Sequence, residues 1–187
     1  MTRASLAVAM ALTLVATVAR ADGTDDNKRL IADCITAAAD VHRVPPAVLV
    51  ILLNVEGGAL GRVSPNTNGT VDIGPMQINQ IWLPQVAAHW HASEADAYRA
   101  LRDGFCANVE AGAWILRKGL DEARGDFWEG VGYYHSHDPQ HKARYLRAVL
   151  QQVLRLRASA GQDDALGKSP RAATLPAPSP TILAGRN

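Results

Sequence analysis

The sequence lacks the excess of basic residues that a nucleic-acid-binding protein usually carries. Its 187 residues include 19 lysines and arginines against 18 aspartates and glutamates, which gives a formal charge of +1. Because phosphate backbones select a basic surface, this balance argues against nucleic acid as the main partner. Hydrophobic residues make up 48% of the chain and charged residues 20%, which is typical of one soluble globular core.

The apolar run near the N-terminus is too short to cross a membrane. It extends from Leu6 to Val18, follows a basic residue and precedes Ala19-Arg20-Ala21. A basic start, a short apolar core and a site of small residues are typical of a secretory signal peptide. We therefore expect residues 1–21 to be removed, and the mature chain to begin at Asp22 in the periplasm without stable membrane insertion. A retained N-terminal anchor is the alternative.

Cysteine is scarce, because only Cys34 and Cys106 occur. In the oxidising compartment that a signal peptide implies, an isolated pair favours one disulfide, with two free buried thiols as the alternative. Chain-entropy estimates credit a bridge across so long a loop with roughly 4 kcal/mol of stability. We expect a disulfide between these two residues.

Apolar residues recur at helical spacing along most of the chain. The predicted helices cover about 30–41, 46–56, 79–89, 94–101, 103–124 and 139–159, with a short segment at about 127–134 before the last. Turn-forming residues dominate between 59 and 75, where Asn68-Gly69 suits a two-residue hairpin turn. The pattern predicts a mainly α-helical (α+β) domain with a small β-hairpin.

The chain shows no internal repeat and no second folded domain. After the signal peptide, residues 22–159 carry all the periodic segments. Residues 160–187 contain proline, alanine, glycine and serine with little periodicity, which is typical of a disordered tail.

Glu56 is the most informative polar residue. It follows a run of apolar residues at the end of a helix that is apolar nearly all round, so we expect it to be partly buried. Desolvation disfavours a charged carboxylate and raises its pKa, which suits a general acid near neutral pH. The alternative is a surface glutamate that closes a helix.

A second set of polar residues follows across the predicted hairpin. Asp72 would place another carboxylate opposite Glu56, and two carboxylates facing each other across a cleft are common in glycoside cleavage. Gln77 and Asn79 offer amide groups suited to sugar hydroxyls and N-acetyl groups. The alternatives are a turn-stabilising role for Asp72, a helix cap at Asn79 and an exposed Gln77.

Three motifs, in this order and spacing, resemble the soluble lytic transglycosylase domain of the lysozyme-like superfamily. That family shows a Glu-Ser-Gly-type motif, a Gly-Leu-Met-Gln-Ile motif and an Ala-Tyr-Asn-type motif. The corresponding segments are Val55-Glu56-Gly57-Gly58, Asp72-Ile73-Gly74-Pro75-Met76-Gln77-Ile78-Asn79 and Tyr133-Tyr134-His135-Ser136. The resemblance covers roughly residues 29–150. The small two-cysteine form resembles the transglycosylases that accompany conjugation and secretion machines.

The resemblance implies a lysozyme-like fold whose hairpin flanks an active-site cleft. It implies cleavage of the β-1,4 MurNAc–GlcNAc bond of peptidoglycan, with the muramic acid 6-hydroxyl as nucleophile and a 1,6-anhydro product. Glu56 would be the single acid/base, and Gln77 and Tyr134 would line the cleft, with Tyr134 near the Glu56 carboxylate. The enzyme would open the wall locally for a secretion or conjugation apparatus.

The chain departs from the family pattern at three positions. Gly57 stands where serine is common, Pro75 replaces leucine, and His135 replaces asparagine, which makes His135 a candidate substrate-binding residue. The segment 66–74 also resembles the hairpin of animal (chicken-type) lysozymes, with Asp72 at their second carboxylate. A hydrolytic lysozyme is therefore the first alternative, and a non-catalytic wall-binding scaffold is the second.

The remaining histidines and tryptophans carry weaker signals. The spacing of His135, His137 and His141 lacks a firm zinc pattern, so we expect no metal there and no cofactor. Trp82 follows the Gln77 motif and suits either sugar stacking or core packing. The helix over 139–159 is basic, which is typical of a solvated face or of loose attraction to anionic polymers.

Overall fold

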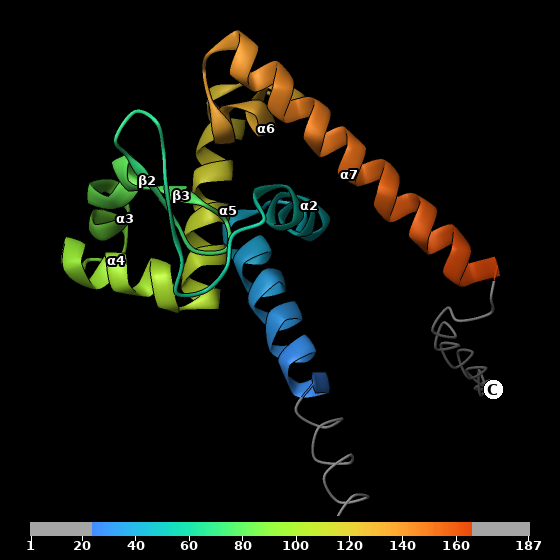
Figure 1. Cartoon of the computed structure of the whole chain (residues 1–187), viewed down its shortest axis with the longest axis horizontal. Coiled ribbons are helices and arrows are strands. Elements are labelled where there is room, and N and C mark those ends of the chain that lie inside the picture. The colour runs from blue at the N-terminus through green and yellow to red at the C-terminus, as the bar shows by residue number, and fades with distance from the viewer. Residues whose placement is uncertain (1–23, 166–187) are drawn as a thin grey trace, which may run out of the picture. The chain divides into compact units, whose positions relative to one another are not determined.

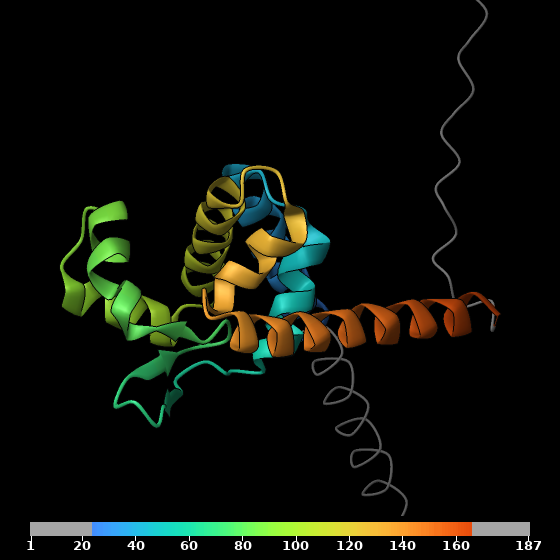
Figure 2. The ribbon, with the colours of Figure 1, turned by 90° about the horizontal axis from the view of Figure 1, so that it is seen from above.

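The computed structural model describes residues 24–165, and the predicted signal peptide lies outside this range. The described chain is mainly α-helical with a small three-stranded antiparallel sheet, as the sequence predicts. Figures 1 and 2 show α3, α4 and the sheet on one side of the central helix α5, with α2 and α6 on the other.

The first two helices are α1 (Thr24–His42) and α2 (Pro46–Glu56). Proline at the first position of α2 costs no hydrogen bond, because the first amides of a helix have no intrahelical partner. Leu49 and Leu52 are fully buried in the core. Gly57 ends the helix in a left-handed conformation with φ 62°, where a glycine needs no steric compensation.

The sheet consists of β1 (Val63–Pro65), β2 (Val71–Ile73) and β3 (Ile78–Asn79), paired in that order. The predicted hairpin is confirmed, but its loop spans residues 66–70 because Pro65 pairs with Val71. The prediction of a two-residue turn at Asn68-Gly69 was therefore wrong. The Asn68 side chain instead accepts a hydrogen bond from the Thr70 amide at 3.1 Å, which forms a turn within a longer loop.

The third strand occupies the start of a segment that the sequence predicts as helix. Asn79 is extended, with φ −64° and ψ 139°, and pairs with Asp72. Helical structure begins only at η1 (Gln80–Trp82), a 3-10 turn, and continues as α3 (Leu83–His89). A two-residue strand is too short to leave a periodic pattern, so sequence reasoning missed it.

The next two helices, α4 (Glu94–Asp103) and α5 (Phe105–Glu122), flank Gly104. Ser93 caps α4 as predicted, and its side chain accepts from the Asp96 amide. The predicted pairing is also confirmed, because a disulfide links Cys34 of α1 to Cys106 of α5, with their Cα atoms 4.9 Å apart.

The last two helices are α6 (Phe127–His135) and α7 (Pro139–Ala165). A Cβ on Gly119 of α5 would lie 2.7 Å from the Gly130 carbonyl oxygen, so the glycine allows α6 to pack closely. Helix α7 continues to Ala165, beyond the predicted end at Ser159. Residues 160–165 are thus helical and do not belong to a disordered tail, and the rest of that predicted tail lies outside the described residues.

The chain divides into two units, Met1–Val153 and Leu154–Asn187, with the boundary inside α7. The buried core and the sheet lie in the first unit. Across residues 24–165, no single helix has both the length and the hydropathy to cross a membrane; α1 and α2 pass that test only as a pair, bent by 118°.

Candidate functional site

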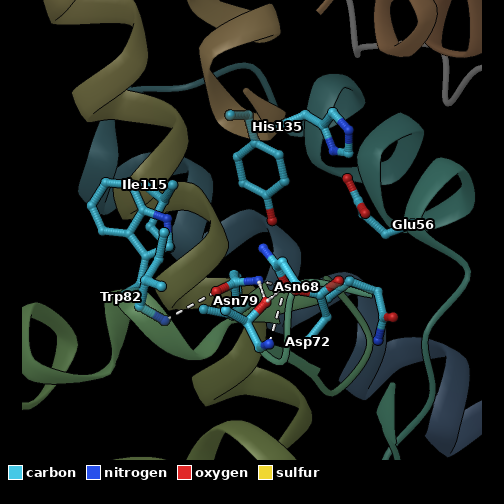
Figure 3. Close-up of a pocket in the computed structure, with 12 residues that line it drawn as sticks. Glu56, Asn68, Asp72, Asn79, Trp82, Ile115 and His135 are labelled. Atoms are coloured by element: carbon cyan, nitrogen blue, oxygen red, sulfur yellow. Dashed lines mark hydrogen bonds between the residues drawn. The ribbon is translucent and has the colours of Figure 1, made fainter. Parts of the chain in front are cut away.

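The candidate site residues from the sequence lie around one cleft of about 260 Å³ in the first unit. Figure 3 shows Glu56 on one wall, Trp82 and Ile115 on another, and Asp72, Asn68 and Asn79 along the floor. The described lining consists of Glu56, Asn68, Thr70, Asp72, Gln77, Ile78, Asn79, Ile81, Trp82, Ile115, Tyr134 and His135. The structure thus brings together all six residues proposed for catalysis and substrate binding.

Glu56 reaches the cleft because of its place on α2. It follows Leu49 and Leu52 by seven and four positions, so it shares the helix face that these leucines bury in the core. The helix ends immediately after it, at Gly57, whose amide donates to the Leu53 carbonyl at 3.1 Å. The carboxylate is therefore held at the boundary between core and cleft.

The surroundings of Glu56 change its acidity. Burial raises the pKa of Glu56 to about 7; a hydrogen bond from Tyr145 opposes this rise, and the charge of Asp72 adds to it. Tyr145 Oη donates to Glu56 Oε1 at 2.7 Å. At neutral pH the protonated and ionised forms are both populated, which is the condition for a general acid that later acts as a base.

Tyr145 was missed by sequence reasoning. It lies on α7, is buried, and its ring lies near two other rings, with His135 stacked at 4.6 Å and Tyr134 at 6.5 Å between centroids. Burial raises the pKa of Tyr145 far above its usual value, so its hydroxyl remains a neutral donor to Glu56. The available signal in the sequence was the pair Tyr145 and Val149, which lie four residues apart on an otherwise basic helix. Both are buried in the structure.

Tyr134 lines the cleft, and its hydroxyl bonds the turn between β2 and β3. Tyr134 Oη donates to the Met76 carbonyl oxygen at 2.9 Å. Burial, together with the charges of Glu56 and Asp72, raises the pKa of Tyr134 well above its usual value. Tyr134 therefore anchors the turn that carries Gln77, and the hydroxyl bound to Glu56 belongs to Tyr145.

Asp72 is held by its neighbour across the sheet. Asn79 Nδ2 donates to Asp72 Oδ1 at 2.7 Å and to Thr70 Oγ1 at 3.0 Å. Asn79 Oδ1 also accepts from the Ile81 amide at 3.1 Å, so the residue caps η1 as well. Asn79 thus caps η1 and also lines the cleft, and Asp72 bonds Asn79 of the next strand.

The turn between β2 and β3 packs tightly against the end of α2. Gln77 has a φ of 48°, and its Nε2 donates to the Gly74 carbonyl at 2.8 Å. A Cβ on Gly58 would lie 2.1 Å from that same carbonyl oxygen. Gly58 thus makes room for the turn.

A buried amide fixes this turn from behind. Asn108 is completely buried on α5, and its Nδ2 donates to the carbonyls of Ile73 at 3.0 Å and Leu101 at 2.9 Å. Its Oδ1 accepts from the Met76 amide at 2.7 Å. Sequence reasoning missed Asn108, because nothing in a helical pattern shows which polar residue will meet a distant turn.

His135 lies at the C-terminal end of α6, stacked on Tyr145. Burial and the nearby charges of His141 and Arg144 lower its pKa, while Asp72 opposes them, so the ring is neutral at pH 7. His137 lies 2.9 Å from Glu122 and is not among the residues that line the cleft. His135 is therefore the one of these three histidines that lies where a substrate could contact it.

No known protein family matches this sequence, and no curated protein matches it. Function is therefore inferred from the cleft residues, their geometry and the motif resemblance.

Proposed function

We propose that this protein cleaves the β-1,4 MurNAc–GlcNAc bond of peptidoglycan as a lytic transglycosylase, with Glu56 as its single acid/base. The observation that carries the proposal is a half-buried carboxyl group with a pKa of about 7 in a cleft lined by amides and hydroxyls. An acid of this strength can donate a proton and then accept one at neutral pH.

The reaction begins with protonated Glu56. Its proton passes to the glycosidic oxygen, the bond from that oxygen to C1 of the muramic acid breaks, and positive charge develops at C1. The 6-hydroxyl of the same sugar then attacks C1 while its proton passes to the Glu56 carboxylate. The acid is regenerated and the product carries a 1,6-anhydro ring, so no water is consumed.

Other cleft residues suit the binding of an amino sugar strand. Asn68, Gln77 and Asn79 supply amide groups for hydroxyls and N-acetyl groups. Asp72 is oriented by Asn79 and supplies negative charge beside the developing positive centre. Trp82 offers an apolar ring for the face of a sugar.

A specific observation favours hydrolysis as the second candidate. Asp72 lines the same cleft as Glu56, and its charge contributes to the raised pKa of Glu56. In a hydrolytic lysozyme Asp72 would stabilise or attack C1, and water would complete the reaction. Glu56 donates the first proton in both reactions.

The proposed setting is the periplasm, which the predicted signal peptide implies. There the enzyme would open the wall locally for a secretion or conjugation apparatus, as the motif resemblance suggests. The Cys34–Cys106 disulfide supports an oxidising compartment.

Mass spectrometry of digested peptidoglycan tests the proposal. We expect 1,6-anhydro-muropeptides from the wild type, none from Glu56→Gln, and an unchanged yield from Glu94→Gln, a matched change at an exposed position. If the products carry reducing ends in place of 1,6-anhydro ends, the protein is a hydrolytic lysozyme and not a transglycosylase. If the folded wild type releases no fragments, the remaining interpretation is the non-catalytic wall-binding scaffold.

A further inference from the structure

A second carboxylate, Glu110, lies in a cluster outside the cleft. It is on α5, and two histidines approach it from the ends of other helices, His42 from α1 and His89 from α3. His42 Nε2 lies 2.6 Å from Glu110 Oε1, and His89 Nε2 lies 3.0 Å from the same oxygen. Within residues 24–165, these are the His, Cys, Asp and Glu side chains whose ligand atoms gather closely enough for a metal, all within 4.8 Å of one another.

The second oxygen of Glu110 has a different partner. Trp90 Nε1 donates to Oε2 at 2.6 Å, so the carboxylate is oriented with Oε1 toward both histidines. Burial tends to raise the pKa of Glu110, but the hydrogen bonds from His89, Trp90 and His42 together lower it, which keeps the carboxylate ionised. Metal-binding carboxylates are commonly held in this way by a neighbouring donor on their other oxygen.

We propose that His42, His89 and Glu110 form a binding site for one Zn²⁺ ion, separate from the glycan cleft. Two imidazole nitrogens and a carboxylate oxygen match the ligands of zinc, with Zn–N and Zn–O distances of about 2.0–2.2 Å. Calcium and magnesium prefer shells made of oxygen alone. The ion would replace the two N–H···O contacts and neutralise the partly buried carboxylate.

The two histidine contacts with Glu110 require little movement to admit the ion. Ligand atoms of a tetrahedral zinc site are about 3.4 Å apart. The contact of His42 with Glu110, now 2.6 Å, would therefore widen by less than ~1 Å. His89 and Glu110 have side-chain exposures of 30% and 27%, so a water molecule can reach the fourth position.

The fold already holds all three ligands in place. Glu110 follows Cys106 by one helical turn on α5, and His42 follows Cys34 on α1, so the disulfide links the two helices that carry these ligands. His89 is fixed by its stacking on Trp114, with 4.6 Å between the ring centroids. A preformed site loses less entropy when it binds an ion.

The zinc site also adjoins one wall of the glycan cleft. Trp114 meets the edge of Trp82 at 6.1 Å between ring centroids, and Trp82 lines the cleft. An ion bound to His89 would restrict the motion of the His89 ring, on which Trp114 stacks. It would therefore also restrict the part of the cleft wall that lies behind Trp82. We infer a role in stabilising this part of the fold.

Calorimetric titration of the chelator-treated, disulfide-bonded protein with ZnCl₂ tests the site. We expect one ion per chain and a melting temperature raised by roughly 5–10 °C at a hundredfold excess of zinc over Kd. Mg²⁺ should produce neither effect. In His42→Gln, the glutamine side chain keeps an N–H donor for Glu110 but is a poor zinc ligand. We expect this variant to bind zinc at least 100-fold more weakly than the wild type.

The matched control is His91→Asn, which changes an exposed histidine near α3 whose φ of 52° asparagine tolerates. Its zinc affinity should equal that of the wild type. X-ray absorption of the wild type, which requires no variant, should show two imidazole ligands. The proposal is overturned if the wild type binds no zinc, if His42→Gln binds it equally well, or if the bound ion lacks imidazole ligands.

Discussion

Glu56 and Glu110 are both partly buried glutamates, yet their surroundings shift their pKa values in opposite directions. Glu56 accepts one hydroxyl donor, and burial raises its pKa to about 7. Glu110 faces three ring nitrogens, and their hydrogen bonds outweigh burial and lower its pKa. The comparison shows that desolvation and the number of nearby donors together decide whether the pKa of a partly buried carboxylate is raised or lowered.

The largest expected effect separates the two carboxylates by activity. Glu56→Gln removes the transferable proton, so we expect the release of muropeptides to fall by about 1,000-fold or more, the scale of a lost general acid. Glu110→Gln, once shown to be folded by circular dichroism, should retain most of the activity. The rate at which purified wall is solubilised measures the activity of both variants. Equal losses of activity in the two folded variants would contradict the different roles of Glu56 and Glu110.

The second effect concerns stability at neutral pH without metal. Glu110→Gln places an NH₂ group among three N–H donors and removes the charge that they stabilise, so we expect a loss of about 3 kcal/mol. Because the pKa of Glu110 is lowered on folding, the wild type's advantage should be present above the ordinary pKa of about 4.5 and disappear as the solution is acidified. Urea unfolding of both proteins at pH 7 and pH 3, with chelator present, measures the difference in their free energies of unfolding. If Glu110→Gln is as stable as the wild type at pH 7, the prediction is contradicted.

The third effect has the opposite sign. Because folding raises the pKa of Glu56 from 4.5 to about 7, ionised Glu56 opposes folding, and the protein loses stability as the pH rises through that interval. A neutral glutamine side chain avoids this cost, so Glu56→Gln should be more stable than the wild type by roughly 2 kcal/mol at pH 8 and equal to it at pH 4. Thermal unfolding at the two pH values is the measurement, with Glu94→Gln as the exposed control. A variant less stable at pH 8 would show that Glu56 is not desolvated.

The smallest effect concerns the donor to Glu56. Tyr145→Phe removes a hydrogen bond that favours the ionised carboxylate, so the pKa of Glu56 should rise by about one further unit. The alkaline limb of the pH–activity profile, set by deprotonation of the acid, should move to higher pH by that amount. Tyr133→Phe, at a half-buried position outside the cleft lining, is the matched control. An unmoved limb would mean that Tyr145 does not set the acidity of Glu56.

Much of the fold could be predicted because its signals are local. The apolar run before Glu56, the prolines that open α2 and the glycines that close it are neighbours in the chain, and the helix ends where they indicate. The hairpin and the pairing of Cys34 with Cys106 were also predictable. The short strand β3 and the helical end of α7 were not, because two residues carry no periodicity and a polar composition does not exclude a helix.

The candidate site was predictable in part, since three motifs in a recognisable order contain Glu56, Asp72, Gln77, Asn79, Tyr134 and His135. Its supporting residues were not. Tyr145 and Asn108 act on groups 89 and 32 positions away in the chain, and helical periodicity does not show which polar side chains will meet. The proposed zinc ligands His42, His89 and Glu110 come from three helices and form no motif.

The sequence by itself determined where most of the helices and the hairpin form, and that a lone carboxyl group stands at the end of an apolar helix. Only the tertiary structure decided the acidity of that group. Desolvation depends on how completely distant segments pack around Glu56, and its one donor arrives from α7. Periodicity is set between neighbours in the chain, whereas burial and hydrogen bonding are set between neighbours in space, and it is the latter that distinguish Glu56 from Glu110.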